Sequence, residues 1–259
     1  MKSGGAVHAT SIISGSVITA VNITTKHNYA EKGSGGALSV VGAVLEISDS
    51  LCKEDSAGGI DGGGFLAVEA CTVKLKRVEI IGACATLAGG GGINAVGSKL
   101  EMHSVLMKDI VSASSGGAVS LSLCQATVIN STFQQCRVEE QSSDQVYGGG
   151  AFALFTRSRL HVLQNLFSNN SAASIGGAIV CDGCAELSIV ETNFESNHAG
   201  KGGALALVGA GGGKVANIDA RSLFVGNSAT SSGGGGIYWQ LFPPNIDQTF
   251  INQYGNDGV

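Results

Sequence analysis

The sequence predicts an all-β fold, a parallel β-helix of about eight to nine coils. Three observations predict it. A glycine-pair motif recurs nine times, alternating apolar residues follow each copy, and a phenylalanine–asparagine motif recurs late in the chain. Successive glycine motifs start 26 to 33 residues apart. A period of this length is typical of repeat architectures, in which each unit buries its apolar face only by stacking on the next one.

The glycine motif consists of two glycines, a small residue and a large apolar residue. A glycine pair predicts a tight corner, where the backbone needs a positive φ or approaches another segment closely. The third position holds only Ala or Gly, which indicates crowding at that point of every coil. The nine copies are Gly4-Gly5-Ala6-Val7, Gly35-Gly36-Ala37-Leu38, Gly62-Gly63-Gly64-Phe65, Gly90-Gly91-Gly92-Ile93, Gly116-Gly117-Ala118-Val119, Gly149-Gly150-Ala151-Phe152, Gly176-Gly177-Ala178-Ile179, Gly202-Gly203-Ala204-Leu205 and Gly234-Gly235-Gly236-Ile237.

Two strands follow each glycine motif. The large apolar residue starts an alternation, and alternation with one apolar side indicates a strand with one buried face. A second short strand follows, in which Leu45 and Ile47 flank Glu46. The apolar pair Leu160 and Val162, which flanks His161, shows the same pattern later in the chain.

A third strand and a corner are predicted at the Phe-x-x-Asn motifs that begin at Phe167, Phe194 and Phe224. Asparagine tolerates the left-handed conformation and bonds to its own backbone, so it suits a corner. Stacked amides can also bond to one another along the axis. We therefore expect three strands and three corners per coil, with one corner at Asn28, Asn170, Asn197 and Asn227.

The repeat pattern predicts the fold and the extent of the domain. A leucine-rich repeat needs a helical segment, and no helical stripe longer than one turn is present; a propeller blade needs a longer period. We predict one β-helix domain over residues 1–240. Residues 241–259 are interpreted as a C-terminal boundary or cap, because Pro243 and Pro244 cannot donate to a central ladder.

Composition excludes several classes of function. The net charge is −5 and no basic run is present, so nucleic acid is not an expected partner. No apolar stretch reaches the length of a membrane span, so direct membrane insertion is not expected. Met1-Lys2-Ser3 leads directly into the first glycine pair, without a signal peptide and without a capping segment for the first coil. The chain is therefore interpreted as a piece of a longer protein.

The combination of Gly-Gly-Ala-Ile/Leu/Val with Phe-x-x-Asn resembles the repeat of the polymorphic outer-membrane protein family of chlamydial surface autotransporters. The resemblance covers about residues 4 to 237. It implies a right-handed β-helix, located extracellularly or at a cell surface and used as an adhesin or stalk. Two features depart from the family: no C-terminal membrane barrel is present, and the early repeats lack Phe-x-x-Asn.

No catalytic constellation stands out. β-Helix enzymes that cleave acidic polysaccharides need clustered carboxylates and a basic residue, whereas the twenty Asp and Glu residues are scattered over different points of their coils. Their convergence beside Arg137, Arg157 or Arg159 would favour such an enzyme. The densest acidic patch, Glu139-Glu140 with Asp144, is interpreted as a solvated loop. The five histidines occupy different registers, so neither a metal nor a cofactor is predicted.

The seven cysteines are interpreted mainly as small buried residues. Register places Cys181 in the core column beside Leu154 and Leu207. The leading alternative is a disulfide between Cys181 and Cys184, which are separated by two residues. Candidate N-glycosylation acceptors are Asn22, Asn130 and Asn169, each two residues before Ser or Thr.

The sequence therefore predicts a non-catalytic structural and adhesive module of a large cell-surface or secreted protein. Expected partners are surface glycans, proteins of a host or neighbouring cell, and further coils of a longer parent chain. One alternative is a polysaccharide-processing, pectin lyase-like enzyme or a carbohydrate-binding module. Another is an array segment with no separate function.

Overall fold

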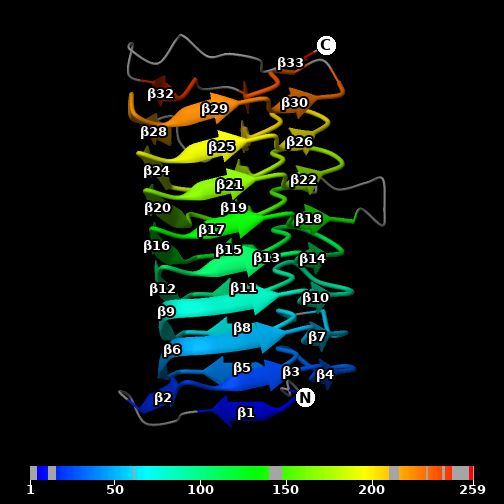
Figure 1. Cartoon of the computed structure of the whole chain (residues 1–259), viewed down its shortest axis with the longest axis vertical. Helices are drawn as coiled ribbons and strands as arrows, with labels where there is room; N and C mark the ends of the chain where they lie inside the picture. The colour runs from blue at the N-terminus through cyan, green and yellow to red at the C-terminus, as the bar shows by residue number, and fades with distance from the viewer. Residues whose placement is uncertain are drawn as a thin grey trace.

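The computed structural model describes residues 5–10, 16–60, 62–139, 148–209, 216–231, 233–240, 243–246 and 257–258. These residues form strands and no helix. Three parallel sheets, named A, B and C below, stack along one long axis as a right-handed β-helix (Figure 1). The all-β fold and the parallel coils predicted from the glycine period are thus confirmed. Within the described part of the chain, no helix is long and apolar enough to cross a membrane.

Sheet A contains nine strands in coil order, each paired in parallel with its neighbours in the adjacent coils. A glycine pair and one further residue precede every strand, as the alternation after each glycine motif predicts. The strands are β1 (Val7–Thr10), β5 (Leu38–Val41), β8 (Leu66–Glu69), β11 (Ile93–Val96), β15 (Val119–Ser122), β19 (Phe152–Phe155), β23 (Ile179–Asp182), β27 (Leu205–Val208) and β31 (Ile237–Trp239).

Sheet B joins the second and third strands of each coil, because the chain bends there without leaving the sheet. In two coils the bend lies inside one long strand, at Asp49 and Arg77, with φ of 53° and 52°. The strands before or through the bend are β2 (Val17–Val21), β6 (Val44–Lys53), β9 (Thr72–Ile81), β12 (Lys99–His103), β16 (Gln125–Ile129), β20 (Arg159–Leu163), β24 (Glu186–Val190), β28 (Ala216–Ile218) and β32 (Asn245–Ile246). Those after the bend are β3 (Thr24–Lys26), β13 (Leu106–Lys108), β17 (Thr132–Gln134), β21 (Leu166–Ser168), β25 (Asn193–Glu195) and β29 (Leu223–Val225).

Sheet C was not predicted. Coils whose sheet B part is divided at the bend have four strands instead of the expected three, whereas the coils of β6 and β9 have three. The nine strands of sheet C have two residues each, which is too short to show an alternation in sequence. They are β4 (Tyr29–Ala30), β7 (Ser56–Ala57), β10 (Cys84–Ala85), β14 (Val111–Ser112), β18 (Arg137–Val138), β22 (Ser171–Ala172), β26 (His198–Ala199), β30 (Ser228–Ala229) and β33 (Asp257–Gly258). Within the predicted boundary segment 241–259, β32 pairs with β28 and β33 with β30.

The third glycine motif lies one residue later than predicted. Leu66 pairs with Leu38, so the structural copy is Gly63-Gly64-Phe65-Leu66 instead of Gly62-Gly63-Gly64-Phe65. Phe65 occupies the position predicted to hold only Ala or Gly, and it is fully buried there. Three consecutive glycines fit either register in sequence. The pairing with the neighbouring coil selects the one that buries both Phe65 and Leu66.

The main hydrophobic core runs along the axis between the three sheets, and a smaller cluster contains Ala153, Ile175, Val180 and Ala206. The longest ordered feature of the main core is a row of four stacked phenylalanines on the strands β17, β21, β25 and β29. Consecutive ring centroids lie 5.0, 4.9 and 4.5 Å apart, with interplanar angles of 12°, 5° and 17°. Each fully buried phenylalanine contributes about 1.5–3 kcal/mol by removal from water. The row consists of Phe133, Phe167, Phe194 and Phe224.

Candidate functional site

The asparagines of the Phe-x-x-Asn motif form a buried ladder along the axis. We name Asn170, Asn197 and Asn227 the asparagine ladder; all three side chains are fully buried. Asn170 Nδ2 donates to Asn197 Oδ1 (2.9 Å), and Asn197 Nδ2 donates to Asn227 Oδ1 (2.9 Å). The same oxygens accept the backbone N–H of the preceding asparagine, each at 3.0 Å. The amides therefore satisfy one another and the backbone from coil to coil.

The left-handed conformation expected of these asparagines falls one residue earlier, so that part of the prediction is wrong. Positive φ values occur at His27, Asn169 and Ser196 (55°, 54° and 54°). These residues project into solvent at the bend, and the asparagine that follows turns its side chain inward. The physical need for Asn at this corner is an amide in the core, which replaces strand partners that the bend removes.

Asp55 takes the place of asparagine near the start of the chain, and its role was not predicted. The side chain is fully buried. Its Oδ1 accepts hydrogen bonds from the backbone N–H and Nδ2 of Asn28 (2.9 and 2.8 Å), and its Oδ2 accepts one from Thr25 Oγ1 (2.5 Å). Unlike an asparagine, Asp55 has no side-chain N–H that could donate to the next coil. The equivalent residue of that coil is Ala83, which has no acceptor in its side chain. Asn28 and Asp55 thus form a short ladder that ends after one step.

The predicted glycine corners occupy one column between sheets C and A. Gly176 has a φ of 63°, where an L side chain is strained. A side chain on Gly177 would collide with the backbone carbonyl of Gly203 in the next coil. The same pair of constraints, positive φ at the first glycine and backbone contact at the second, holds at Gly35 and Gly36, Gly116 and Gly117, Gly149 and Gly150, and Gly202 and Gly203.

The cysteines are mostly buried, and one pair is bonded. Cys181 and Cys184 form a disulfide with Cα atoms 5.4 Å apart, which closes the corner between β23 and β24. Burial raises the pKa of the Cys52 and Cys136 thiols to about 12. Such thiols are protonated at neutral pH, so they are poor nucleophiles and poor metal ligands.

The three candidate glycosylation asparagines are exposed and lie at bends. Asn22, Asn130 and Asn169 have φ values of 54°, 50° and 54°. Asn22 and Asn130 occupy the bend inside sheet B, and Asn169 occupies the bend between sheets B and C. All three amides therefore lie on the outside of the stack, where a glycan would not enter the core.

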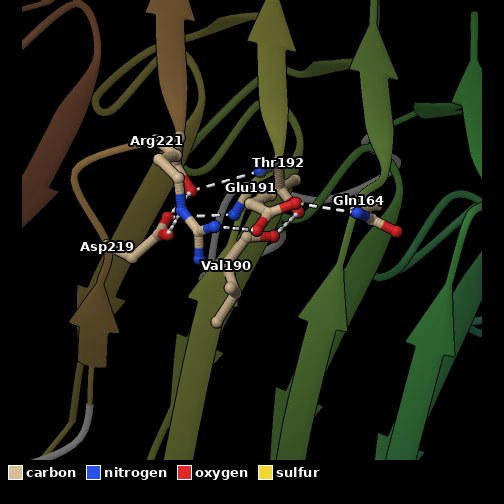
Figure 2. Close-up of polar contacts among 7 residues, drawn as sticks. Gln164, Val190, Glu191, Thr192, Asp219 and Arg221 are labelled. Carbon is tan, nitrogen blue, oxygen red and sulfur yellow. Dashed lines mark hydrogen bonds and ion pairs between the residues drawn. The ribbon is translucent and has the colours of Figure 1, made fainter.

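Two carboxylates do converge, contrary to the prediction that stacking leaves them scattered. Arg221 lies between Asp219 and Glu191 (Figure 2). Its guanidinium forms ion pairs with both: Nε lies 3.1 Å from Asp219 Oδ2, and Nη1 contacts Glu191 Oε1. Gln164 Nε2 donates to the other Glu191 oxygen (2.7 Å). We name these four residues the acidic corner.

The acidic corner is arranged to hold charge rather than to transfer protons. Burial opposes ionisation of Asp219, but hydrogen bonds from Ser222 Oγ (2.7 Å) and the Glu191 N–H (2.9 Å), together with Arg221, hold its pKa below the ordinary value. A general acid for glycoside cleavage needs a raised pKa. Asp49 beside Arg77 and Glu101 beside Lys99 also have lowered pKa values.

The three arginines singled out from the sequence do not gather carboxylates. Arg137 pairs with Glu139, the residue that directly follows β18 (2.8 Å), and Arg159 Nε lies 3.9 Å from Glu186. Residues 140 and 144 of the predicted acidic patch lie outside the described residues. Within the described ranges, no group of three His, Cys, Asp or Glu residues could hold a metal ion.

The comparisons with known proteins agree with the repeat geometry. Residues 166–182 match the family model described as the Chlamydia polymorphic membrane protein (Chlamydia_PMP) repeat. This segment contains Phe167, Asn170 and the glycine motif at Gly176. Residues 166–182 are thus similar to one copy of the chlamydial polymorphic membrane protein repeat. Searches among curated proteins and among solved structures found no match to this chain.

Two further ladders support the repeated coils and were not predicted from the sequence. At the bend inside sheet B, the Ser131 N–H donates to Asn165 Oδ1 (2.8 Å) and the Thr192 N–H to Ser222 Oγ (3.1 Å). At the corner between sheets A and B, the Cys71 N–H donates to Ser98 Oγ (3.0 Å). A small polar residue or cysteine follows most of these bends in the sequence and could have predicted the ladders. Because its type changes between Ser, Thr, Asn and Cys from coil to coil, no single-residue repeat is visible.

Proposed function

We propose that this chain is a non-catalytic structural and adhesive module of a cell-surface or secreted protein. It acts as a rigid spacer that presents its outer faces to surface glycans or to proteins of a host or neighbouring cell. The observation that carries the proposal is the in-register stack with its buried asparagine and phenylalanine rows. Buried, fully satisfied polar ladders fix one arrangement of each coil on the next.

The match to a chlamydial polymorphic membrane protein repeat supports a surface location. The exposed positions of Asn22, Asn130 and Asn169 are compatible with an extracellular environment, since glycans there would point away from the stack. Further coils of a parent chain would extend the same sheets from either end.

The enzyme alternative is weakened by the acidic corner. Both carboxylates of that corner are paired with Arg221, and Asp219 is held ionised. A polysaccharide hydrolase or lyase needs a protonated acid or a free base at a substrate cleft.

The proposal is tested with beads coated with the protein. Beads should adhere to cells in shear flow, and adhesion should fall at temperatures at which Asn197→Ala is unfolded and the wild type is folded. The same protein is incubated with polygalacturonate and with neutral glucan while reducing ends and unsaturated products are followed. No turnover is expected. Turnover that disappears in Asp219→Asn would overturn the non-catalytic assignment, and absence of adhesion to every cell type tested would overturn the adhesive one.

A further inference from the structure

A basic hollow lies at the corner between sheets A and B, across four successive coils. It is an open surface depression with a volume of about 580 Å³. Its floor is the Cys71–Ser98 ladder described above. We name as the basic hollow the depression lined by Ala70, Cys71, Thr72, Gly97, Ser98, Lys99, Leu123, Cys124, Gln125, Arg157 and Arg159.

The hollow exists because one corner residue lacks a side chain. The same left-handed column holds Ala70, Gly97, Leu123 and Arg157 in successive coils, with φ values between 53° and 59°. A Cβ added at Gly97 would meet nothing within 4 Å. Leu123 and Arg157 on one side and Ala70 on the other therefore border an open gap at Gly97.

Leu123 is unusual for such a position. It is 56% exposed and has a φ of 57°. Among the described residues with positive φ, it is the one large aliphatic side chain. A bulky residue in this conformation is strained, and strain of this kind clusters at ligand-contacting sites. An exposed leucine offers an apolar contact at the rim of the hollow.

The charge of the hollow is opposite to that of the chain. Three basic residues line it and no Asp or Glu does, although the net charge is −5. Lys99 Nζ is held by Glu101 Oε1 (2.7 Å), and Arg159 is only loosely paired with Glu186 at 3.9 Å. Arg157 has no ion-pair partner within the part of the chain that the structure describes. Two guanidinium groups are therefore available to an anion.

We propose that the basic hollow binds an acidic saccharide, the ligand class being a glycan that carries carboxylate or sulfate groups. Arg157 and Arg159 bind the anionic group, because planar guanidinium groups match carboxylate and sulfate oxygens in a bidentate way. Thr72 Oγ1 and the Gln125 amide bond to sugar hydroxyls. Leu123 packs against the apolar face of the ring. This inference rests on the proposed adhesive function and specifies one of its ligands.

The direct test measures binding of immobilised protein to polygalacturonate, chondroitin sulfate and neutral dextran at low and moderate salt. Binding of at least one acidic polymer, falling with salt, and no binding of dextran are expected. The carboxylated and the sulfated polymer separate the two sources of negative charge. Equal binding of dextran, or binding of neither acidic polymer, would overturn the proposal.

Two pairs of variants locate the site. The double variant Arg157→Gln/Arg159→Gln should bind at least tenfold more weakly, whereas Arg137→Gln on sheet C, which also removes a positive charge, should leave binding unchanged. Gly97→Leu fills the hollow and should also abolish binding. Its control is Gly226→Leu, which substitutes another left-handed glycine at the bend between sheets B and C, where an added Cβ would meet only Ser196 Oγ at 3.6 Å.

Circular dichroism checks that each variant is folded. If Arg137→Gln weakens binding as much as the double variant does, the assignment of binding to the basic hollow is wrong. Full binding by the double variant would also overturn the assignment. If beads adhere to cells but acidic glycans do not bind, this inference fails and the adhesive function stands. If the beads do not adhere to cells and acidic glycans do not bind, the adhesive function and this inference both fail.

Discussion

The asparagine ladder makes a quantitative prediction for Asn197→Ala. In the native stack the Asn197 amide takes part in four hydrogen bonds, all buried. Its Nδ2 donates to the Phe167 carbonyl (3.0 Å) and to Asn227 Oδ1 (2.9 Å). Its Oδ1 accepts from the backbone N–H and the Nδ2 of Asn170 (3.0 and 2.9 Å). Alanine removes the whole group without introducing a clash.

The magnitude follows from the partners left behind. The Asn170 N–H and the Phe167 carbonyl lose their side-chain partner in a site with no exposure to solvent. A buried unsatisfied group costs about 1–3 kcal/mol, and each further lost hydrogen bond costs about 1 kcal/mol. We therefore expect Asn197→Ala to lower the free energy of unfolding by about 3–5 kcal/mol, which is a large share of a total of about 5–15 kcal/mol.

The assay is urea unfolding followed by far-ultraviolet circular dichroism, with the midpoint and slope compared between variants. The matched control is Asn169→Gly, one residue earlier, where the side chain is exposed and glycine tolerates the φ of 54°. The control should stay within about 0.5 kcal/mol of the wild type. A loss below about 1 kcal/mol in Asn197→Ala, or an equal loss in the control, would refute the ladder as a source of stability.

Three further predictions concern the core, the acidic corner and the thiols. Phe194→Ala, between rings at 4.9 and 4.5 Å, should cost about 3–5 kcal/mol, measured by thermal melting; a loss below about 1 kcal/mol contradicts it. Asp219 has a lowered folded-state pKa, so its contribution to stability is present above its ordinary pKa of 3.8 and is lost as the pH falls through the folded value. Asp219→Asn should therefore be less stable than the wild type at pH 7, and urea midpoints should converge below pH 3.8; a constant difference at all pH values contradicts this. Cys52 and Cys136, with pKa values of about 12, should resist iodoacetamide at neutral pH until urea unfolds the chain, as mass spectrometry of each peptide would show; alkylation in the native protein contradicts their burial.

The glycine period was enough to predict the coils and the strands of sheet A, whereas the inward-facing residues of sheet B were predicted from the alternating apolar pairs and the Phe-x-x-Asn motifs. The glycine period succeeded because each coil repeats the same constraint: Gly177 must approach the backbone of Gly203, and no other residue type fits. Periodicity of that kind is legible in sequence because one residue type is required.

The basic hollow and the acidic corner could not be predicted in the same way. Arg157 and Arg159 lie in a different coil from Gly97, and their relative positions depend on how many residues each corner holds. Measured between residues that pair across the two coils, the connection from β28 to β29, which contains Asp219, is one residue longer than the connection from β24 to β25, which contains Glu191. The glycine period does not predict this difference in length. Sheet C escaped notice because its strands are too short to alternate.

The in-register pairing of the coils makes them interchangeable. Ile175 bridges to Lys201 across one whole coil, so the two residues occupy the same point of successive coils. A deletion of residues 176–201 would join equivalent points, placing Phe167 beside Phe224, Asn170 beside Asn227 and Leu154 beside Leu207. In these three columns each residue would meet one of its own type. A gene encoding such an array can therefore gain or lose single repeats by recombination, and the length of the rod can change over evolution without redesign of any surface between coils.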